Sequence, residues 1–342
     1  MKPFVFALVL PALTASAAPV VIDDMAALKT MREKLGELAE KHESTDGKTL
    51  MAKLEKAPKK AAVALPATPP KPAGYNDLVK SVFVVASAYK CADCDEWHNG
   101  GTASAWCLTE DGVMVTNRHV FLAPEDESWG VYGVDGKIYK ITAILASDPE
   151  ADAVLFKIDP AGAKLTPLKL GTDADVGTKV RILSHPGEHF YFQTSGEVSR
   201  YSMDRTLEDD SKETLWQSVT AEFAEGSSGG PVIDADGVVV GMVSNVEAIN
   251  HIGEEEPATE TPDPKRPVEQ GAKPADPKAG KDKKAPTPPK KETPKPKDVP
   301  KEAPKDAPSP KGQPVPEPEG NEQQMMIKNC VPASKILNLI EK

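Results

Sequence analysis

The chain has 342 residues, enough for one large domain or two small ones, but 33 prolines and an aromatic content of 5% indicate that part of it lies outside any packed core. The formal net charge of −11 provides no basic surface, so nucleic acid is not expected as a partner. This balance is typical of a soluble protein of an aqueous compartment.

The N-terminus has the pattern of a secretory signal. A basic start at Met1-Lys2 precedes an apolar run from Phe4 to Leu13, and Ala15-Ser16-Ala17 offers small residues for cleavage. Residues 1–18 are therefore predicted to be a signal peptide cleaved near Ala17 or Ala18, which implies export to a periplasm or secretion. An uncleaved anchor is the alternative, although the run is short for a membrane span; no other segment could cross a membrane.

Residues 19–56 are predicted to form an N-terminal helical segment. Apolar residues recur at steps of three and four between Ile22 and about Lys41, which describes one face of a helix. Leu28, Met31, Leu35 and Leu38 would suit the seam of a short coiled coil. Self-association into a homo-oligomer through this helix is one hypothesis, and a helix packed on its own domain is the other. Residues 57–74, rich in Ala, Pro and Lys, are predicted to be a linker.

From residue 75 to residue 252 the pattern changes to short β-branched and apolar runs. Turn signals such as Glu110-Asp111-Gly112 and Asp135-Gly136 separate them. Many short strands at even spacing predict an all-β barrel or sandwich, and two groups of strands fit a double barrel. The predicted strands are Ser81–Ala88, Ala103–Leu108, Val113–Thr116, Lys137–Leu145 and Ala153–Ile158, and then Lys179–Leu183, Tyr191–Tyr201, Thr214–Phe223, Pro231–Ile233 and Val238–Val246.

Residues 253–321 are dominated by Pro, Lys, Glu and Asp and are predicted to be disordered, since they cannot bury enough apolar surface. A solvated spacer is favoured over a ligand for a proline-recognising module. Residues 322–342 then return to a strand-like run, Gln324–Val331, and a helix ending near Glu341. The proline-rich segment is thus predicted to be a long insertion before a C-terminal helix, which slowly growing loop-closure entropy permits.

Three polar stretches contain candidate catalytic residues. Thr116-Asn117-Arg118-His119-Val120 offers a base, residues 148–155 offer an orienting acid, and residues 225–231 set a serine among glycines. Such glycines bring N–H groups close to a bound atom, and a hydroxyl presented there can attack a carbonyl. Taken alone, the Ser/Gly cluster would fit a polar surface turn equally well. The chain order His, Asp, Ser is that of the chymotrypsin fold.

These stretches resemble the HtrA (Deg) type of trypsin-like serine endopeptidase. That family has its histidine in T-N-x-H-V, its aspartate in D-[IL]-A-[LV] and its serine in G-N-S-G-G, so His119, Asp152 and Ser228 fall on the three positions by resemblance. The resemblance covers about residues 75–252 and a short C-terminal piece, with no stretch left for a PDZ domain. Ser227 stands where Asn is usual. Further similar stretches are Gly101–Trp106, in which Ala103 and Ala105 replace glycines, His185-Pro186-Gly187 and Thr194–Ser199.

The resemblance implies an all-β, chymotrypsin-like double β-barrel that hydrolyses polypeptides, in particular unfolded or damaged proteins, through a covalent serine ester. Ser228 would be the nucleophile, His119 the base and Asp152 the group that orients the imidazole, with backbone N–H groups of Gly226 and Ser228 as the oxyanion hole. No cofactor is needed. The residues Glu222, Phe223 and Ala224 would shape the specificity pocket, with Phe223 filling it or Glu222 facing inward.

Two readings from other classes remain open. A latent or non-hydrolytic binding or scaffold protein could retain the protease fold, and the departures at Ala103, Ala105 and Ser227 allow for it. A lectin-like β-sandwich binder would make the ordered His, Asp and Ser a coincidence.

The remaining cysteines and histidines are given structural roles. Cys91 and Cys94 form a C-x-x-C that could close a local disulfide ring, and with His98 they make an incomplete zinc set, so no metal site is expected. Cys107 and Cys330 are expected to be buried core residues. His185 and His189 are expected at the surface or in the second barrel, and Asp148 in a turn.

Overall fold

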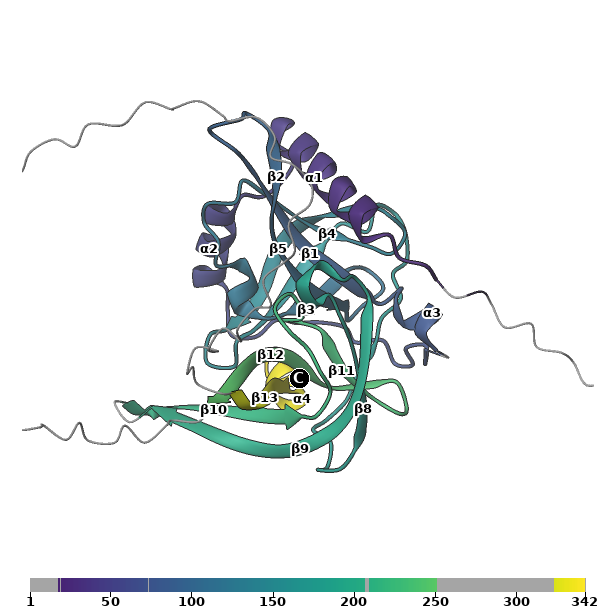
Figure 1. Ribbon diagram of the computed structural model, residues 1–342, viewed down its shortest axis with the longest axis vertical. Helices are drawn as coiled ribbons and strands as arrows, with labels where there is room; N and C mark the ends of the chain where they lie inside the picture. Colours follow the sequence, from purple (N-terminus) through teal and green to yellow (C-terminus); the bar gives the residue numbers. More distant parts are fainter. Residues whose placement is uncertain (1–17, 19, 73, 207–208, 251–322, 342) are drawn as a thin grey trace, which may run out of the picture. The chain divides into compact units, whose positions relative to one another are not determined.

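A computed structural model describes residues 18, 20–72, 74–206, 209–250 and 323–341 of the chain (Figure 1). The predicted insertion at 253–321 and all but the last residue of the predicted signal peptide lie outside the described residues. In the described part of the chain, no helix is both long enough and apolar enough to span a bilayer.

The first half of the β-domain is a closed barrel of six antiparallel strands in the order β1-β2-β3-β6-β5-β4. Pairing of β1 with β4 closes it. Aromatic rings fill its interior, where Phe121 meets Phe156 and Trp129 edge to face at centroid distances of 5.3 and 5.5 Å. The strands are β1 Val82–Lys90, β2 Trp97–Cys107, β3 Val113–Thr116, β4 Ser128–Tyr132, β5 Ile138–Asp148 and β6 Ala153–Ile158.

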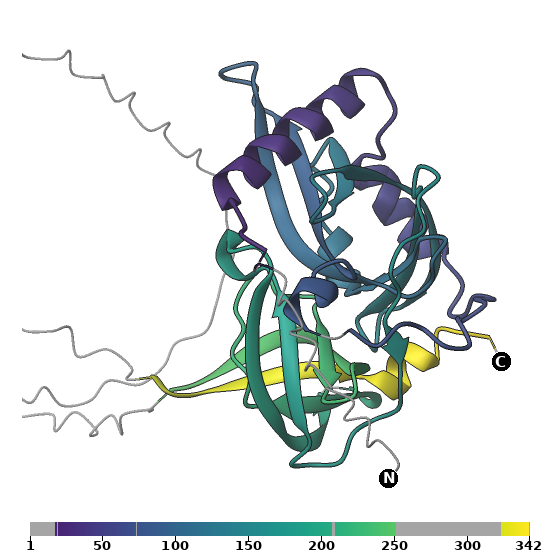
Figure 2. The same ribbon diagram turned by 90° about the vertical axis from the view of Figure 1, so that its right-hand side faces the viewer.

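The second half is a seven-stranded sheet in the order β11-β8-β9-β10-β13-β12-β7, which curls on itself because β11 also pairs with β12. The C-terminal strand β13 lies between β10 and β12, and Figure 2 shows it in yellow beside the green strands. The double β-barrel expected from the sequence is therefore confirmed. The strands are β7 Lys169–Leu170, β8 Lys179–Ser184, β9 Phe192–Thr206, β10 Asp209–Val219, β11 Pro231–Asp234, β12 Val238–Asn250 and β13 Gln323–Pro332.

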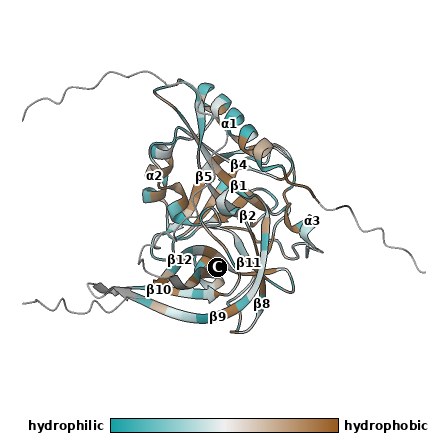
Figure 3. Ribbon diagram, viewed as in Figure 1, coloured by the Kyte–Doolittle hydropathy of each residue, from teal (hydrophilic) through white to brown (hydrophobic). Residues whose placement is uncertain are grey.

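Two helices precede the barrels: α1, Asp24–Glu40, and α2, Gly47–Lys56. Each is preceded by a capping aspartate whose side chain accepts a hydrogen bond from a first-turn N–H group, Asp23 from Ala26 and Asp46 from Thr49. Helix α1 lies across the strands of the first barrel (Figure 1), and its hydrophilic residues, teal in Figure 3, contrast with the apolar strands beneath it. The sequence predicted α1 but did not distinguish α2 as a second helix.

The apolar face of α1 belongs to the core of its own chain. Met31 and Leu35 are 1% and 0% exposed, and Gly36 lets the indole of Trp97 approach so closely that a Cβ there would lie 2.6 Å from it. A coiled-coil seam through Met31 and Leu35 is therefore wrong, because the barrel already occupies that face. The heptad-like spacing reflects helix-on-barrel packing, the alternative considered from the sequence.

Leu35→Ala is expected to lower the free energy of unfolding by about 2–5 kcal/mol, because the cavity it leaves is sealed by the barrel. Met25→Ala, on the same helix but 75% exposed, is the control and should change stability by less than about 0.5 kcal/mol. Urea denaturation measures both, and equal effects would contradict the described packing of α1.

The predicted linker contains no helix or strand between residues 57 and 72, but it is attached to the domain. Ala61 forms a parallel bridge with Ile340, and the N–H of Ser147 donates to the carbonyl of Pro58 at 2.9 Å. The short helix α3, Tyr75–Leu78, follows, and α4, Ala333–Leu337, comes after β13 with Ile336 buried. Segments from both ends of the sequence thus meet beside the barrels.

Candidate active site

His119 is carried by a short 3₁₀ helix, Arg118–Phe121, that starts directly after β3. Phe121, fully buried, fixes the far end of this turn in the barrel core. Before it, the Asn117 side-chain amide and the Arg118 N–H both donate to the backbone carbonyl of Asp152, at 2.9 and 3.2 Å. The histidine turn is therefore tied to the aspartate segment through the backbone as well as through side chains.

Asp152 stands immediately before β6 and has a positive φ of 50°, an uncommon backbone state for a residue other than glycine. Its Oδ1 accepts from the His119 N–H at 2.9 Å, and its Oδ2 lies 2.6 Å from His119 Nδ1 and accepts from Ser244 Oγ at 3.1 Å. Three donors thus fix the carboxylate against the imidazole. Asp148 instead accepts the N–H groups of Glu150 and Ala151, as expected of a turn residue.

Ser228 lies in a loop held in shape by Gly226 and Gly229, with φ of 86° and 88°. A Cβ on Gly229 would lie 2.1 Å from the Ser104 carbonyl, so only glycine fits there. The Ser228 hydroxyl donates to the Ser244 carbonyl at 3.1 Å; among the described residues no hydrogen bond joins it to His119. Ser228 and His119 nevertheless line the same pocket, of about 190 Å³, together with Gly226.

Carbonyl groups of the serine loop are each held by a specific donor. The Glu225 carbonyl accepts from Gly187 N–H at 2.8 Å, the Gly226 carbonyl from Ser104 Oγ at 3.0 Å, and the Ser228 carbonyl from Ser104 N–H at 2.8 Å. In the described part of the chain the N–H groups of Gly226 and Ser228 donate no hydrogen bond, whereas those of Ser227, Gly229 and Gly230 do. The two N–H groups predicted to bind an oxyanion are therefore left available.

Ser227, which replaces the usual asparagine, is fully buried and its hydroxyl accepts from Ser184 Oγ at 3.0 Å. Ala103 lines the pocket, and Ala105 is enclosed in the core of the first barrel. The three departures from the family pattern thus sit in ordinary packed surroundings.

His185, expected at the surface or in the second barrel, directly follows the second-barrel strand β8 and is 0% exposed, whereas His189 is exposed. The ring Nδ1 of His185 accepts the Tyr191 N–H at 2.9 Å, and its backbone carbonyl lies where a Cβ on Gly226 would be 2.4 Å away. Burial lowers the pKa of His185 to about 3, so the ring is neutral. His185 therefore packs directly against the loop that carries Ser228.

The stability of the protein is expected to fall as pH is lowered from about 6.5 toward about 3, partly because of His185. Within this window the unfolded chain binds a proton at this ring and the folded chain does not, so acid favours unfolding. His185→Asn keeps an acceptor for Tyr191 N–H without titrating. Urea denaturation at a series of pH values should show a steeper acid loss in the wild type than in the variant; equal slopes would contradict a neutral buried His185.

The three consecutive residues expected to shape the specificity pocket lie in different surroundings. Phe223 is buried, whereas the Glu222 side chain is 77% exposed and pairs with Lys328 Nζ at 3.0 Å. Lys328, nearly buried on β13, also donates to the Phe223 carbonyl at 2.8 Å and lies 5.4 Å from the centre of its ring. Ala224 contributes a carbonyl that accepts the Ser227 N–H. An inward-facing Glu222 is therefore not the arrangement observed.

Residues 103–242 match the family model of the trypsin-like peptidase domain. The match includes His119, Asp152 and Ser228. This part of the chain is therefore a trypsin-like peptidase domain, similar to those of HtrA (Deg) proteases.

Similar proteins come from plants, bacteria and fungi. The chain is 29% identical over 154 residues to Protease Do-like 5, chloroplastic, of Arabidopsis thaliana, covering 42% of this chain and 47% of the relative. A probable periplasmic serine endoprotease DegP-like of Pseudomonas putida (strain W619) is 31% identical over 145 residues, covering 42% and 29%. The pro-apoptotic serine protease nma111 of Aspergillus terreus is 30% identical over 190 residues, covering 52% and 18%. The chain thus spans less than half the length of each of these relatives.

Several residues that organise the candidate site were given no role from the sequence. Ser244, Ser104 and Lys328 reach the site from β12, β2 and β13, and Gly187 reaches it from the turn after β8. Ser104 stands within the stretch whose resemblance was noted, but serines such as Ser244 have no local pattern that distinguishes them. Only the pairing of distant strands brings them to Asp152 and Ser228.

Proposed function

We propose that this chain is an exported serine endopeptidase that hydrolyses peptide bonds through an acyl-enzyme on Ser228. The observation that carries the proposal is that His119 and Ser228 line one pocket, while the Asp152 carboxylate is hydrogen-bonded to His119 Nδ1. This leaves the other ring nitrogen, Nε2, to act as a base. Because Nδ1 carries the proton given to Asp152, Nε2 can take a proton from the serine hydroxyl.

In the first step Ser228 Oγ attacks the substrate carbonyl carbon while its proton passes to His119 Nε2. The developing oxyanion would accept hydrogen bonds from the N–H groups of Gly226 and Ser228, which have no other acceptor among the described residues. His119 then gives the proton to the leaving amine, and the ester bond to Ser228 forms as the peptide bond breaks. Water, deprotonated by His119, hydrolyses the ester and restores the serine.

The size of the pocket supports a polypeptide substrate. At about 190 Å³ it is smaller than the roughly 300–1,000 Å³ that sites for small molecules occupy, and it can take one side chain of a longer ligand. Unfolded or damaged proteins are the proposed substrates, because only an extended chain would bring its backbone between Ser228 and the loop N–H groups.

Export is proposed from the signal pattern of the N-terminus. The side chain of Asn76 holds the chain just after the expected cleavage, accepting from Val20 N–H at 3.2 Å and donating to the Ala18 carbonyl at 2.9 Å. Cleavage after Ala17 would leave this attachment in place.

The test compares the wild type with Ser228→Ala, using reduced casein as an unfolded substrate and a fluorophosphonate as a probe of the nucleophile. Loss of both cleavage and labelling in the variant is the expected result. One observation favours a competing function, a latent or non-hydrolytic scaffold: the Ser228 hydroxyl donates its hydrogen bond to the Ser244 carbonyl. Absence of labelling in folded wild-type protein would support that alternative and overturn the proposal.

A further inference from the structure

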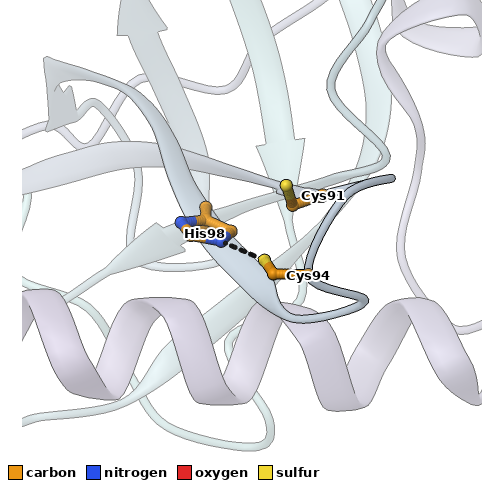
Figure 4. Close-up of side chains that lie close together, drawn as sticks. All are labelled: Cys91, Cys94 and His98. Atoms are coloured by element: carbon orange, nitrogen blue, oxygen red, sulfur yellow. Dashed lines mark hydrogen bonds between the residues drawn. The ribbon is translucent and has the colours of Figure 1, made fainter. Parts of the chain in front are cut away.

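The tip of the β1–β2 hairpin brings two thiols and an imidazole together, outside the proposed active site. The ligand atoms of Cys91, Cys94 and His98 all lie within 4.8 Å of one another, and Cys94 Sγ lies 3.1 Å from His98 Nε2 (Figure 4). From the sequence no metal was expected here, because a C-x-x-C and one histidine make an incomplete zinc set. The fold adds that all three side chains converge.

A tight turn shapes the cysteine segment. Cys91 N–H donates to the Glu96 carbonyl and Asp95 N–H to the Cys91 carbonyl, both at 2.9 Å. Asp95 has a φ of 57°, and its carboxylate pairs with Lys90 Nζ at 2.9 Å. The loop therefore closes on itself directly after the second cysteine, which turns both sulfur atoms toward the same side.

The histidine is held from the opposite strand. In the β1–β2 ladder His98 faces Tyr89, and the two rings stack with centroids 5.6 Å apart. The preceding residue, Trp97, packs on Gly36 of α1 and donates from Nε1 to Glu40 at 3.0 Å. The Tyr89 ring thus packs on the imidazole, and α1 holds the strand that carries it.

We propose that Cys91, Cys94 and His98 bind one Zn²⁺ ion at the hairpin tip. Two thiolates and one imidazole form a donor set that suits this cation. In a tetrahedral site with Zn–S of about 2.3 Å and Zn–N of about 2.0–2.1 Å, ligand atoms lie roughly 3.5–3.8 Å apart, so small side-chain rotations close the cluster. With three protein ligands, the fourth position would be filled by water.

The site would also stiffen one wall of the pocket that holds His119 and Ser228. Strand β2 carries His98 near its start and then Gly101, Thr102 and Ala103, which line that pocket. Zinc binding is nevertheless independent of whether the chain is a protease, and its test needs no substrate.

The test uses the full chain, reduced under anaerobic conditions and freed of metal with a chelator. Co²⁺, a spectroscopic substitute for Zn²⁺, should bind one ion per chain with a thiolate-to-cobalt charge-transfer band, and Zn²⁺ should displace it. Cys94→Ser and His98→Asn should weaken binding by more than about 10-fold, since even the loss of an outer partner of a metal ligand costs about 10–100-fold. The matched control is His42→Asn, an exposed histidine at a φ of 56° that Asn tolerates, and it should bind as the wild type does.

Thermal unfolding provides a second readout. Zn²⁺ should raise the Tm of the wild type but not that of Cys94→Ser, because only a ligand of the folded state stabilises it. The proposal is overturned if the reduced, folded wild type gives no thiolate–cobalt band, or if His98→Asn binds as tightly as the wild type. Native protein recovered with a Cys91–Cys94 disulfide and no affinity for Zn²⁺ after reduction would instead assign the pair a redox role.

Discussion

Replacing Asp152 by Asn is expected to lower kcat by about 10⁴-fold while the chain remains folded. All three groups around this carboxylate are donors: His119 N–H at Oδ1, and His119 Nδ1 and Ser244 Oγ at Oδ2. An asparagine supplies only one acceptor oxygen. If its NH₂ group faces the imidazole, Nδ1 must accept and the ring proton moves to Nε2, which can then no longer take a proton from Ser228.

The measurement is kcat on a fluorogenic peptide, with fluorophosphonate labelling to count competent sites. Ser244→Ala serves as the comparison, because it removes one donor to Asp152 without changing the tautomer of His119, and its loss of activity should be much smaller. An Asp152→Asn variant with nearly wild-type kcat would mean that Asp152 does not orient the base.

Gly226→Ala is expected to lower kcat by about 10²–10³-fold, the usual effect of losing one oxyanion donor. The φ of Gly226 is 86°, and a Cβ there would lie 2.4 Å from the carbonyl oxygen of buried His185. The backbone has to move, and the Gly226 N–H would move with it. The proposed oxyanion site would therefore be lost even though Ser228 and His119 remain.

Gly136→Ala is the matched control for this change. Gly136 has a similar φ of 78°, but a Cβ there meets nothing within 4 Å, so it incurs the left-handed backbone strain without a collision. Both variants should lose a little stability in urea, and only Gly226→Ala should lose kcat. Equal kcat values for the two variants would exclude a role for the Gly226 backbone in turnover.

The strands that the sequence predicted best are those with a clear local signal. Val113–Thr116 and Ala153–Ile158 were predicted with the bounds that β3 and β6 have, because turn residues flank short apolar runs. Strand β4 was missed. It contains Gly130, which its packing against Leu35 of α1 requires, since a Cβ there would lie 2.8 Å from that side chain. A glycine that is needed for packing against a distant helix resembles a turn residue in the sequence, so the strand around it is not predicted.

In the proposed site, too, local motifs could be predicted and long-range contacts could not. Motifs located His119, Asp152 and Ser228, but the groups that hold them come from contacts between segments far apart. Ser104 reaches the Gly226 carbonyl across 122 positions, and Ser244 reaches Asp152 across 92. The partner of the apolar face of α1 was left open for a related reason: an amphipathic helix has the same spacing whether it packs on a second helix or on a barrel.

The place where β13 joins the second barrel has a consequence for the integrity of the chain. Asn250 and Gln323, the described residues on either side of segment 251–322, pair across the β12–β13 ladder, and β13 is hydrogen-bonded on both edges. A single cut between residues 251 and 322 would therefore produce two polypeptides that share one barrel. Its stability would then depend on protein concentration, as for a heterodimer. Denaturing electrophoresis would report two fragments where native mass reports one intact enzyme.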